Sequence, residues 1–299
     1  MRGEKKHRSA RLVCTLILAV STIAQARIIH VDDNAPPGGD GTSWATAHRF
    51  LQDALAEAEA GDEIQVGQGV YKPDRGSAWP EGSGDRAASF VLPEGVTVRG
   101  GYAGLASVDP NERDLQLYET VLSGDLVGDD VEDAPALLMH EEARWNNSLN
   151  VVVAGSEAVL EGVTVTGGFA WPGRCTPPYC PDQWPLDEHI GGGALIKADG
   201  VVLRECLFVG NFAEQGGGGL FIHQSESVLL ENCAFHGNAA TTGGGGAFTN
   251  HSEAQIQGCR FSENWTSVSG GGLCSENSDL IVSDCLLASN QAANGGGDE

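Results

Sequence analysis

Positive charge is scarce in this sequence of 299 residues. Lysine and arginine together number 17, against 41 aspartates and glutamates, and the formal net charge is −24. Five of the cations lie within the first eleven residues, so residues 27–299 carry 12 cations against 40 acids, a charge of −28. Such a surface repels phosphate backbones and anionic membranes. The composition therefore excludes nucleic acid as a partner.

Long apolar runs are also missing. The longest, residues 12–24, has thirteen residues, fewer than the roughly 20 that a helix needs to span a bilayer. It follows a basic start and precedes Ala-Gln-Ala at residues 24–26, which is the pattern of a secretory signal peptide. We therefore expect residues 1–26 to be removed on export. Cys14 has no lipobox before it, so we expect no lipid anchor.

Helical periodicity is absent from residues 191–299, which excludes helical and ankyrin-like repeats. Instead, four cysteines recur at intervals of 27, 26 and 26 residues, and each unit is preceded by a glycine run. Apolar residues alternate within a unit, as in VVLRECLF, which is the period of a strand. Short strands repeated at a fixed period predict an all-β parallel β-helix. We expect the glycines at its corners, where they tolerate positive φ.

Each column of the repeat should form a ladder along the solenoid axis, with neighbours about 4.8 Å apart. The sequence predicts cysteine and phenylalanine ladders inside the solenoid, with the cysteines buried and reduced. It also predicts an internal asparagine ladder, in which stacked amides satisfy one another. The ladder residues are Cys206, Cys233, Cys259 and Cys285; Phe208, Phe235 and Phe261; and Asn211, Asn238, Asn264 and Asn290.

Weaker copies of the strand pattern extend the solenoid upstream, so we expect it to cover residues 62–299, with regular repeats of about 26 residues over 191–299. A Pro- and Trp-rich insertion at residues 170–190 predicts a projecting loop. Residues 27–61 predict a strand, a loop and an amphipathic capping helix that ends at Gly61. The last repeat is incomplete, and an uncapped rung exposes strand edges. This predicts either a missing C-terminal segment or end-to-end self-association.

Two stretches resemble known families. Residues 28–71, which open with IIHVDDNAPPGGDGTSWATAH, resemble the start of secreted bacterial proteins of the pectin-lyase-like right-handed β-helix superfamily. The repeats GGGAL…FVGN, GGGGL…FHGN and GGGGA…FSEN resemble the GGA(I/L) and FxxN repeats of chlamydial polymorphic outer membrane proteins. The resemblance implies a right-handed solenoid that is secreted, or displayed at the cell surface or outer membrane of a bacterium. It also implies a non-catalytic role in adhesion or polysaccharide binding.

Catalysis is the alternative, because the same fold hosts polysaccharide lyases and hydrolases. A pectate-lyase-like mechanism needs a basic residue beside calcium, but Arg204 and Arg260 fall in different columns, two rungs apart. Glycoside hydrolysis needs two carboxylates about 5–9.5 Å apart. In the repeats, Glu205 and Glu231 are the pair that could approach this separation, since they lie on adjacent rungs at one corner. We expect no catalytic residues and keep this pair as the alternative.

Two acidic loops are candidate calcium sites, although neither has EF-hand spacing and each is also typical of a solvated turn. We therefore expect no cofactor, with calcium as the alternative. The candidate ligands are Asp32, Asp33, Asp40, Asp125, Asp129 and Asp130. Cys175 and Cys180 lie in the projecting loop, where an exported protein can form a disulfide.

Aromatic and polar columns after the glycine runs are the candidate binding surface. If the preceding residues point inward, Phe221 and Phe248 point outward as an exposed aromatic step beside His223 and Asn250. Such a step could stack a sugar ring, and Trp171 and Trp184 of the loop offer the same chemistry. The alternative is that the two phenylalanines lie under the loop as a satellite core.

Overall fold

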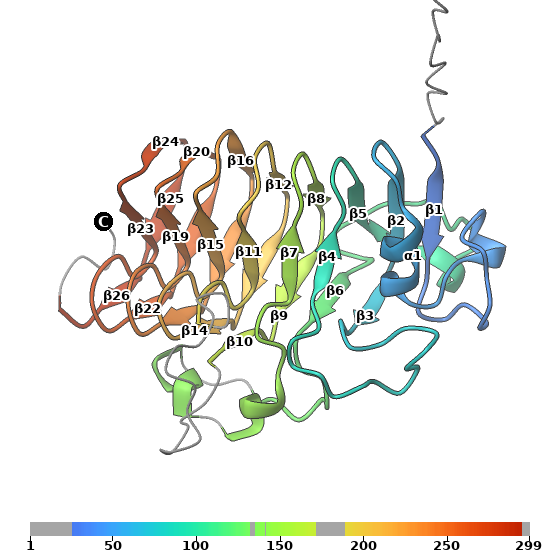
Figure 1. The fold of residues 1–299 in the computed structure, drawn as a ribbon, viewed down its shortest axis with the longest axis horizontal. Helices are drawn as coiled ribbons and strands as arrows, with labels where there is room; N and C mark the ends of the chain where they lie inside the picture. The colour runs from blue at the N-terminus through green and yellow to red at the C-terminus, as the bar shows by residue number, and fades with distance from the viewer. Residues whose placement is uncertain (1–25, 132–134, 141, 172–188, 295–299) are drawn as a thin grey trace, which may run out of the picture.

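The computed structural model describes residues 26–131, 135–140, 142–171 and 189–294. These residues form a solenoid of short strands, and the chain advances along one axis from coil to coil (Figure 1). All pairings between the strands are parallel. The predicted all-β parallel β-helix is therefore confirmed. Residues 1–25 and 172–188, which hold most of the predicted signal peptide and projecting loop, lie outside the described residues.

Four sheets run along the solenoid. The eight-stranded sheet contains β1 (Ile28–Val31), β2 (Glu63–Gly67), β5 (Thr97–Tyr102), β8 (Val159–Glu161), β12 (Val202–Arg204), β16 (Val228–Glu231), β20 (Glu253–Gln257) and β24 (Asp279–Ser283). The seven-stranded sheet contains β3 (Gly69–Tyr71), β6 (Thr120–Ser123), β9 (Thr164–Thr166), β13 (Leu207–Val209), β17 (Ala234–His236), β21 (Arg260–Ser262) and β25 (Leu286–Ala288). The six-stranded sheet contains β4 (Phe90–Leu92), β7 (Val152–Ala154), β11 (Ala194–Ile196), β15 (Leu220–His223), β19 (Ala247–Asn250) and β23 (Leu273–Glu276). The five-stranded sheet contains β10 (Phe169–Ala170), β14 (Phe212–Ala213), β18 (Ala239–Ala240), β22 (Trp265–Thr266) and β26 (Gln291–Ala292).

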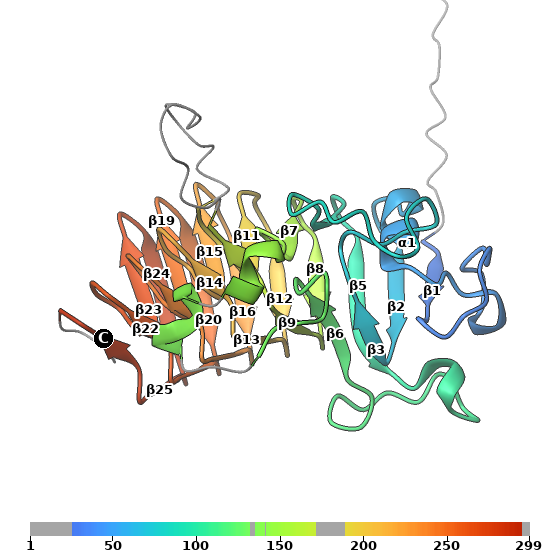
Figure 2. The same cartoon turned by 90° about the horizontal axis from the view of Figure 1, so that it is seen from below.

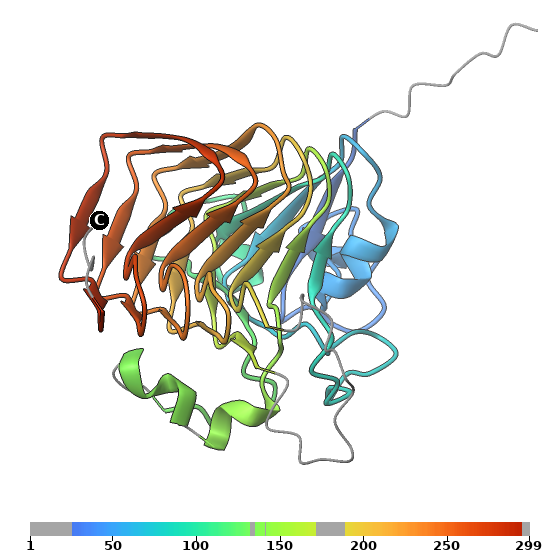
Figure 3. The ribbon, with the colours of Figure 1, turned by 60° about the vertical axis from the view of Figure 1, so that its left-hand side comes forward.

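A complete coil takes one strand from each sheet. Strands β11, β12, β13 and β14 form one coil, and β15 begins the next directly above β11. Seen toward the axis in Figure 3, the coils stack in register around a common interior. Corners between sheets are made by residues in the left-handed region, such as Glu205 (φ 52°) and Asn232 (φ 54°) between the eight- and seven-stranded sheets.

The interior is filled by the ladders of the repeat. The rings of Phe208, Phe235 and Phe261 are fully buried and stacked. Asn238, also fully buried, donates from Nδ2 to the carbonyl oxygen of Phe208 in the preceding coil and to Oδ1 of Asn264 in the following one. The same bonds recur along the column, so the side-chain amides satisfy the corner backbone inside the solenoid.

The glycine runs combine the predicted positive φ with a close approach between coils, which the sequence did not predict. Gly217 (φ 64°) and Gly243 (φ 67°) do adopt positive φ. Gly219 and Gly246 do not, but a Cβ on Gly219 would lie 2.5 Å from the carbonyl oxygen of Gly246. Backbone atoms of the adjacent coil thus fill the space that a side chain would need.

At the N-terminal end a short helix replaces a strand. The helix α1 (Leu51–Glu57) packs against β4, β1 and β2 and buries Leu51, Ala54 and Leu55. It is shorter than the sequence predicts, because the chain is already extended at Ala58 and Gly61 lies beyond its end. Two 3-10 helices, η1 (Trp44–Thr46) and η2 (Gly104–Ala106), lie near this end.

A second pair of short helices flanks the five-stranded sheet. These are η3 (Pro135–His140) and η4 (Glu142–Asn146), which lie over the strands when the solenoid is seen from below in Figure 2. The first contacts β18 and β22, and Leu138 packs with Phe169, Phe212 and Ala239 in a small core outside the main one. This face of the solenoid is therefore partly covered by the chain itself.

Candidate functional site

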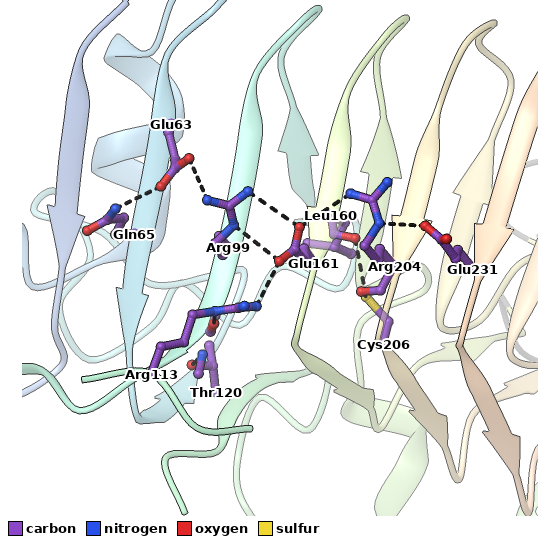
Figure 4. A network of polar contacts seen from close by, with 12 residues as sticks. Glu63, Gln65, Arg99, Arg113, Thr120, Leu160, Glu161, Arg204, Cys206 and Glu231 are labelled. Atoms are coloured by element: carbon purple, nitrogen blue, oxygen red, sulfur yellow. Dashed lines mark hydrogen bonds and ion pairs between the residues drawn. The ribbon is translucent and has the colours of Figure 1, made fainter. Parts of the chain in front are cut away.

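A ladder of ion pairs runs across the eight-stranded sheet (Figure 4). The parallel register aligns Arg99 with Glu161, Glu161 with Arg204, and Arg204 with Glu231. Arg204 Nε lies 2.7 Å from Glu231 Oε2, and this hydrogen bond raises the pKa of Arg204. Arg99 Nη1 lies 2.8 Å from Glu63 Oε2 at the other end of the ladder. Charges of opposite sign on successive rungs thus neutralise one another.

Glu161 is the centre of this ladder. It is 6% exposed, and its carboxylate oxygens lie 3.2 Å from Arg99 Nε, 3.0 Å from Arg113 Nη2 and 3.5 Å from Arg204 Nη1. This network was not predicted from the sequence. The signal that could have shown it is the alternation of positive and negative side chains at equivalent repeat positions. The carboxylates of the ladder are therefore engaged in ion pairs with arginines.

Of the carboxylate pair considered for catalysis, Glu231 belongs to this ladder and Glu205 does not. The register places Arg204, and not Glu205, beside Glu231, so the nearest group to the Glu231 carboxylate is a guanidinium. Glu205 lies at the corner itself, and its backbone N–H donates to the carbonyl oxygen of Glu231. Arg260 lies in β21, in a different sheet from Arg204.

The acidic loops differ in how their carboxylates are used. Asp125, Asp129 and Asp130 bring one oxygen each within 4.8 Å of the others. Asp125 also accepts the backbone N–H groups of Gly128 and Asp130, and Arg144 Nη1 lies 3.5 Å from Asp130 Oδ2. Local donors and a cation thus already engage this group. It remains a candidate calcium site only.

The carboxylates of the first acidic loop are held separately. Asp32 is buried and accepts the backbone N–H groups of Asn34 and Leu105. Burial raises the pKa of Asp33, whereas hydrogen bonds from Thr42 and Thr46 lower the pKa of Asp40 to about 2. The structure does not group these three aspartates as metal ligands.

A groove of about 420 Å³ lies over β15, β19 and β23. Its floor includes Phe221 and Phe248, whose rings meet edge to face with centroids 5.1 Å apart. They are only 4% and 9% exposed and pack with Ile190 and Leu195. The exposed aromatic step is therefore wrong, because both rings pack among neighbouring apolar side chains and only small parts of them reach the groove.

Polar side chains form one wall of this groove. The register aligns His223, Asn250 and Glu276 on three successive rungs. His223 Nδ1 lies 3.0 Å from Asn250 Oδ1, and Asn250 Nδ2 donates to Glu276 Oε2 at 3.3 Å. Donors and acceptors therefore repeat along the groove at the spacing of the strands. This is the arrangement that can bind an extended ligand made of repeated polar units.

Of the tryptophan and disulfide candidates, only Trp171 lies among the described residues. Trp171 is half-buried against Phe169 and Phe212, with ring centroids 5.8 and 5.9 Å away. Trp184, Cys175 and Cys180 lie outside the described residues. Cys206, Cys233 and Cys259 are buried free thiols, while Cys274 and Cys285 are half-buried ones.

Within the described ranges, no helix is long and apolar enough to cross a membrane. A family model described as "Right handed beta helix region" matches residues 186–297. No curated protein matches the chain.

Solved structures resemble the chain over most of its length. The pectate lyase Pel9A matches with 14% identity and a TM-score of 0.53, over 92% of this chain and 58% of the lyase, so this chain spans less than two thirds of that enzyme. The pectin methylesterase PemA from Erwinia chrysanthemi matches at 11% identity and a TM-score of 0.39, over 87% of this chain and 67% of its own. A pectin methylesterase from Aspergillus niger matches at 12% identity and 0.37, over 90% and 87%. Together with the four parallel sheets, the family model and the lyase match show that this chain folds as an all-β right-handed parallel β-helix.

Proposed function

We propose that the protein is a non-catalytic β-helix that binds polysaccharide, exported from a bacterium and displayed at or released from the cell surface. The observation that carries the proposal is the groove over β15, β19 and β23. It combines an apolar floor with a wall of donors and acceptors that repeats once per coil. Coils about 4.8 Å apart have a spacing close to the length of one sugar unit.

The composition of the groove suits a sugar chain. Small exposed parts of Phe221 and Phe248 belong to the floor, and the apolar face of a pyranose ring can contact such apolar surface. His223, Asn250 and Glu276 supply both donors and acceptors for hydroxyl groups. The pectate lyase of the same fold is named for a polysaccharide substrate, which is consistent with a ligand of this class.

The ion pairs formed by the carboxylates of the eight-stranded sheet support binding without turnover. Glu231 and Glu161 are engaged by arginines, so neither is available as an acid or base without breaking an ion pair. A groove with an apolar floor and a polar wall can hold a glycan. Glycoside hydrolysis needs two carboxylates, however, and Glu276 is the single carboxylate among the described residues that line the groove. Adhesion to a glycan-coated surface is the role that we infer.

Affinity electrophoresis in gels that contain neutral or acidic polysaccharides tests the proposal. We expect retardation by at least one polysaccharide, and we expect Asn250→Ala to weaken it by about tenfold, because Asn250 is the middle member of the polar wall. We expect His223→Ala to weaken the retardation as well. Its matched control is His236→Ala, which should leave the retardation unchanged because His236 is exposed on β17, in another sheet.

The same polysaccharides, incubated with calcium, test the enzymatic alternative. Release of unsaturated or reducing ends that Glu231→Gln abolishes would contradict a non-catalytic role. Retardation that is unchanged by both Asn250→Ala and His223→Ala would rule out the groove as the binding site.

A further inference from the structure

A second concavity, of about 190 Å³, lies between the start of α1 and the end of β3. Arg49, Lys72 and Arg75 line it together with Phe50, Tyr71 and Asp33. It shares no residue with the groove over β15, β19 and β23. Three cations in one small pocket are unexpected in a chain with 17 cations against 41 acids.

These cations differ from most others in the part of the chain that the structure describes. Arg27, Arg99, Arg113, Arg144 and Arg204 each form an ion pair with a carboxylate. Among the described residues, Arg49, Lys72 and Arg75 form none. With acids in large excess, cations left unpaired and gathered around one concavity are available to an anion from outside.

Two details of the pocket support the binding of an anion there. Arg75 Nε is buried and finds no acceptor among the described residues, and an unsatisfied buried donor is costly. Burial lowers the pKa of Lys72, and the charge of Arg75 lowers it further. The two cations are therefore held near each other in a partly desolvated place, where an anion between them would be favourable.

Acidic groups around the pocket restrict what can enter. Asp33 and Glu81 line it, and the charges of Asp125, Asp74 and Asp130 also act on Lys72. A long polyanion would also meet the acidic remainder of the surface. The volume is below the 300 Å³ or so at which drug-sized ligand pockets begin. A small ligand with one charged group fits both the volume of the pocket and the acidic charge around it.

We propose that this pocket binds an oxoanion carried by a molecule no larger than a monosaccharide. Arg49 and Arg75 present the guanidinium forks that suit carboxylate and phosphate oxygens, and Lys72 adds a point charge. Phe50 and Val70 provide apolar surface for the body of the ligand. A sugar carboxylate and a free phosphate share this chemistry, and the experiment separates them.

Titration calorimetry of the full chain with glucuronate, inorganic phosphate and glucose tests the site. We expect glucuronate or phosphate to bind, glucose not to bind, and the affinity to fall as NaCl is raised, because the pocket is open to solvent. Arg75→Gln and Arg49→Gln should each weaken binding by about tenfold. Arg49 is exposed, so its variant tests the site even if Arg75→Gln folds poorly.

Arg260→Gln is the matched control, because Arg260 is an exposed arginine on β21, away from the pocket lining. Binding of glucuronate over phosphate would assign the oxoanion to an acidic sugar, and the reverse would assign it to free phosphate. Failure of both anions to bind at low salt would overturn the proposal. An equal loss of anion affinity in Arg260→Gln and Arg49→Gln would also overturn the proposal. Neither result would affect the groove, whose test uses other residues.

Discussion

The rings of Phe208 and Phe235 lie parallel, with an interplanar angle of 5° and centroids 4.9 Å apart, and Phe261 continues the stack at 4.8 Å. Phe235 is thus in contact with a ring on each side. We expect Phe235→Ala to lower the free energy of unfolding by about 3–5 kcal/mol, because it opens a cavity in a column that cannot close around it. Ser262→Ala, on the outer face of β21, should cost less than about 0.5 kcal/mol. Equal shifts of the two variants in urea unfolding would contradict the assignment of the columns.

Gly219→Ala tests the close approach between coils. The new Cβ would lie 2.5 Å from the carbonyl oxygen of Gly246, so the coils must separate locally. Gly237→Ala is the control: its φ is 62°, but the nearest atom to its Cβ would be 3.8 Å away. The control should cost about 1–2 kcal/mol from backbone strain alone. We expect a larger loss for Gly219→Ala, measured by thermal unfolding, and the opposite order would show that positive φ, not proximity, requires these glycines.

The ion-pair ladder should depend most on its central carboxylate. Glu161→Gln leaves three arginines around an uncharged amide, and we expect a loss of about 2 kcal/mol, reduced from the value for fully buried pairs because the arginines are partly exposed. Glu231→Gln removes one partner at the rim and should cost less than about 1 kcal/mol. If high salt removes the whole difference between the two variants in denaturant titrations, Glu161 behaves as a surface charge and the expectation is wrong.

Cys233, in the middle of the cysteine ladder, should be unreactive in the folded protein. Hydrogen bonds with the flanking thiols of Cys206 and Cys259, together with burial, raise the pKa of Cys233. A thiol whose folded pKa is raised stays protonated through neutral pH, and the thiolate is the reactive form. We expect Cys233 to be alkylated at pH 8 only after denaturation, whereas Cys274, half-buried at the groove, reacts earlier. Mass spectrometry of tryptic peptides would show the order, and rapid labelling of Cys233 would contradict it.

The repeat made the regular coils predictable from the sequence. Since one spacing fixes the register of all columns, the positions of Phe235, Cys233 and Asn238 inside the solenoid follow from the alignment alone. The burial of Phe221 did not follow, because its cover includes Ile190, which belongs to the irregular segment before the repeats. Outward pointing and exposure are different properties, and only the first is encoded in strand alternation.

The cationic pocket shows a second limit of the sequence. Arg49 precedes α1, whereas Lys72 and Arg75 follow β3, and no period relates them. Their approach depends on how one irregular coil closes at the N-terminal end, where the helix takes the place of a strand. Their lack of carboxylate partners is a property of three-dimensional neighbours and has no counterpart in the local sequence.

The amide of Asn238 bonds to the coil before it and to the coil after it, so it ties together three coils rather than two. A coil that is weakly coupled to its neighbour can be lost from the end of a stack at little cost to the others. Here, the loss of one coil also removes a partner of the asparagine in the preceding coil, whose Nδ2 and backbone N–H both use the same oxygen. The asparagine column therefore strengthens the coupling between adjacent coils, and it favours melting of the regular coils as a single unit over progressive fraying from one end.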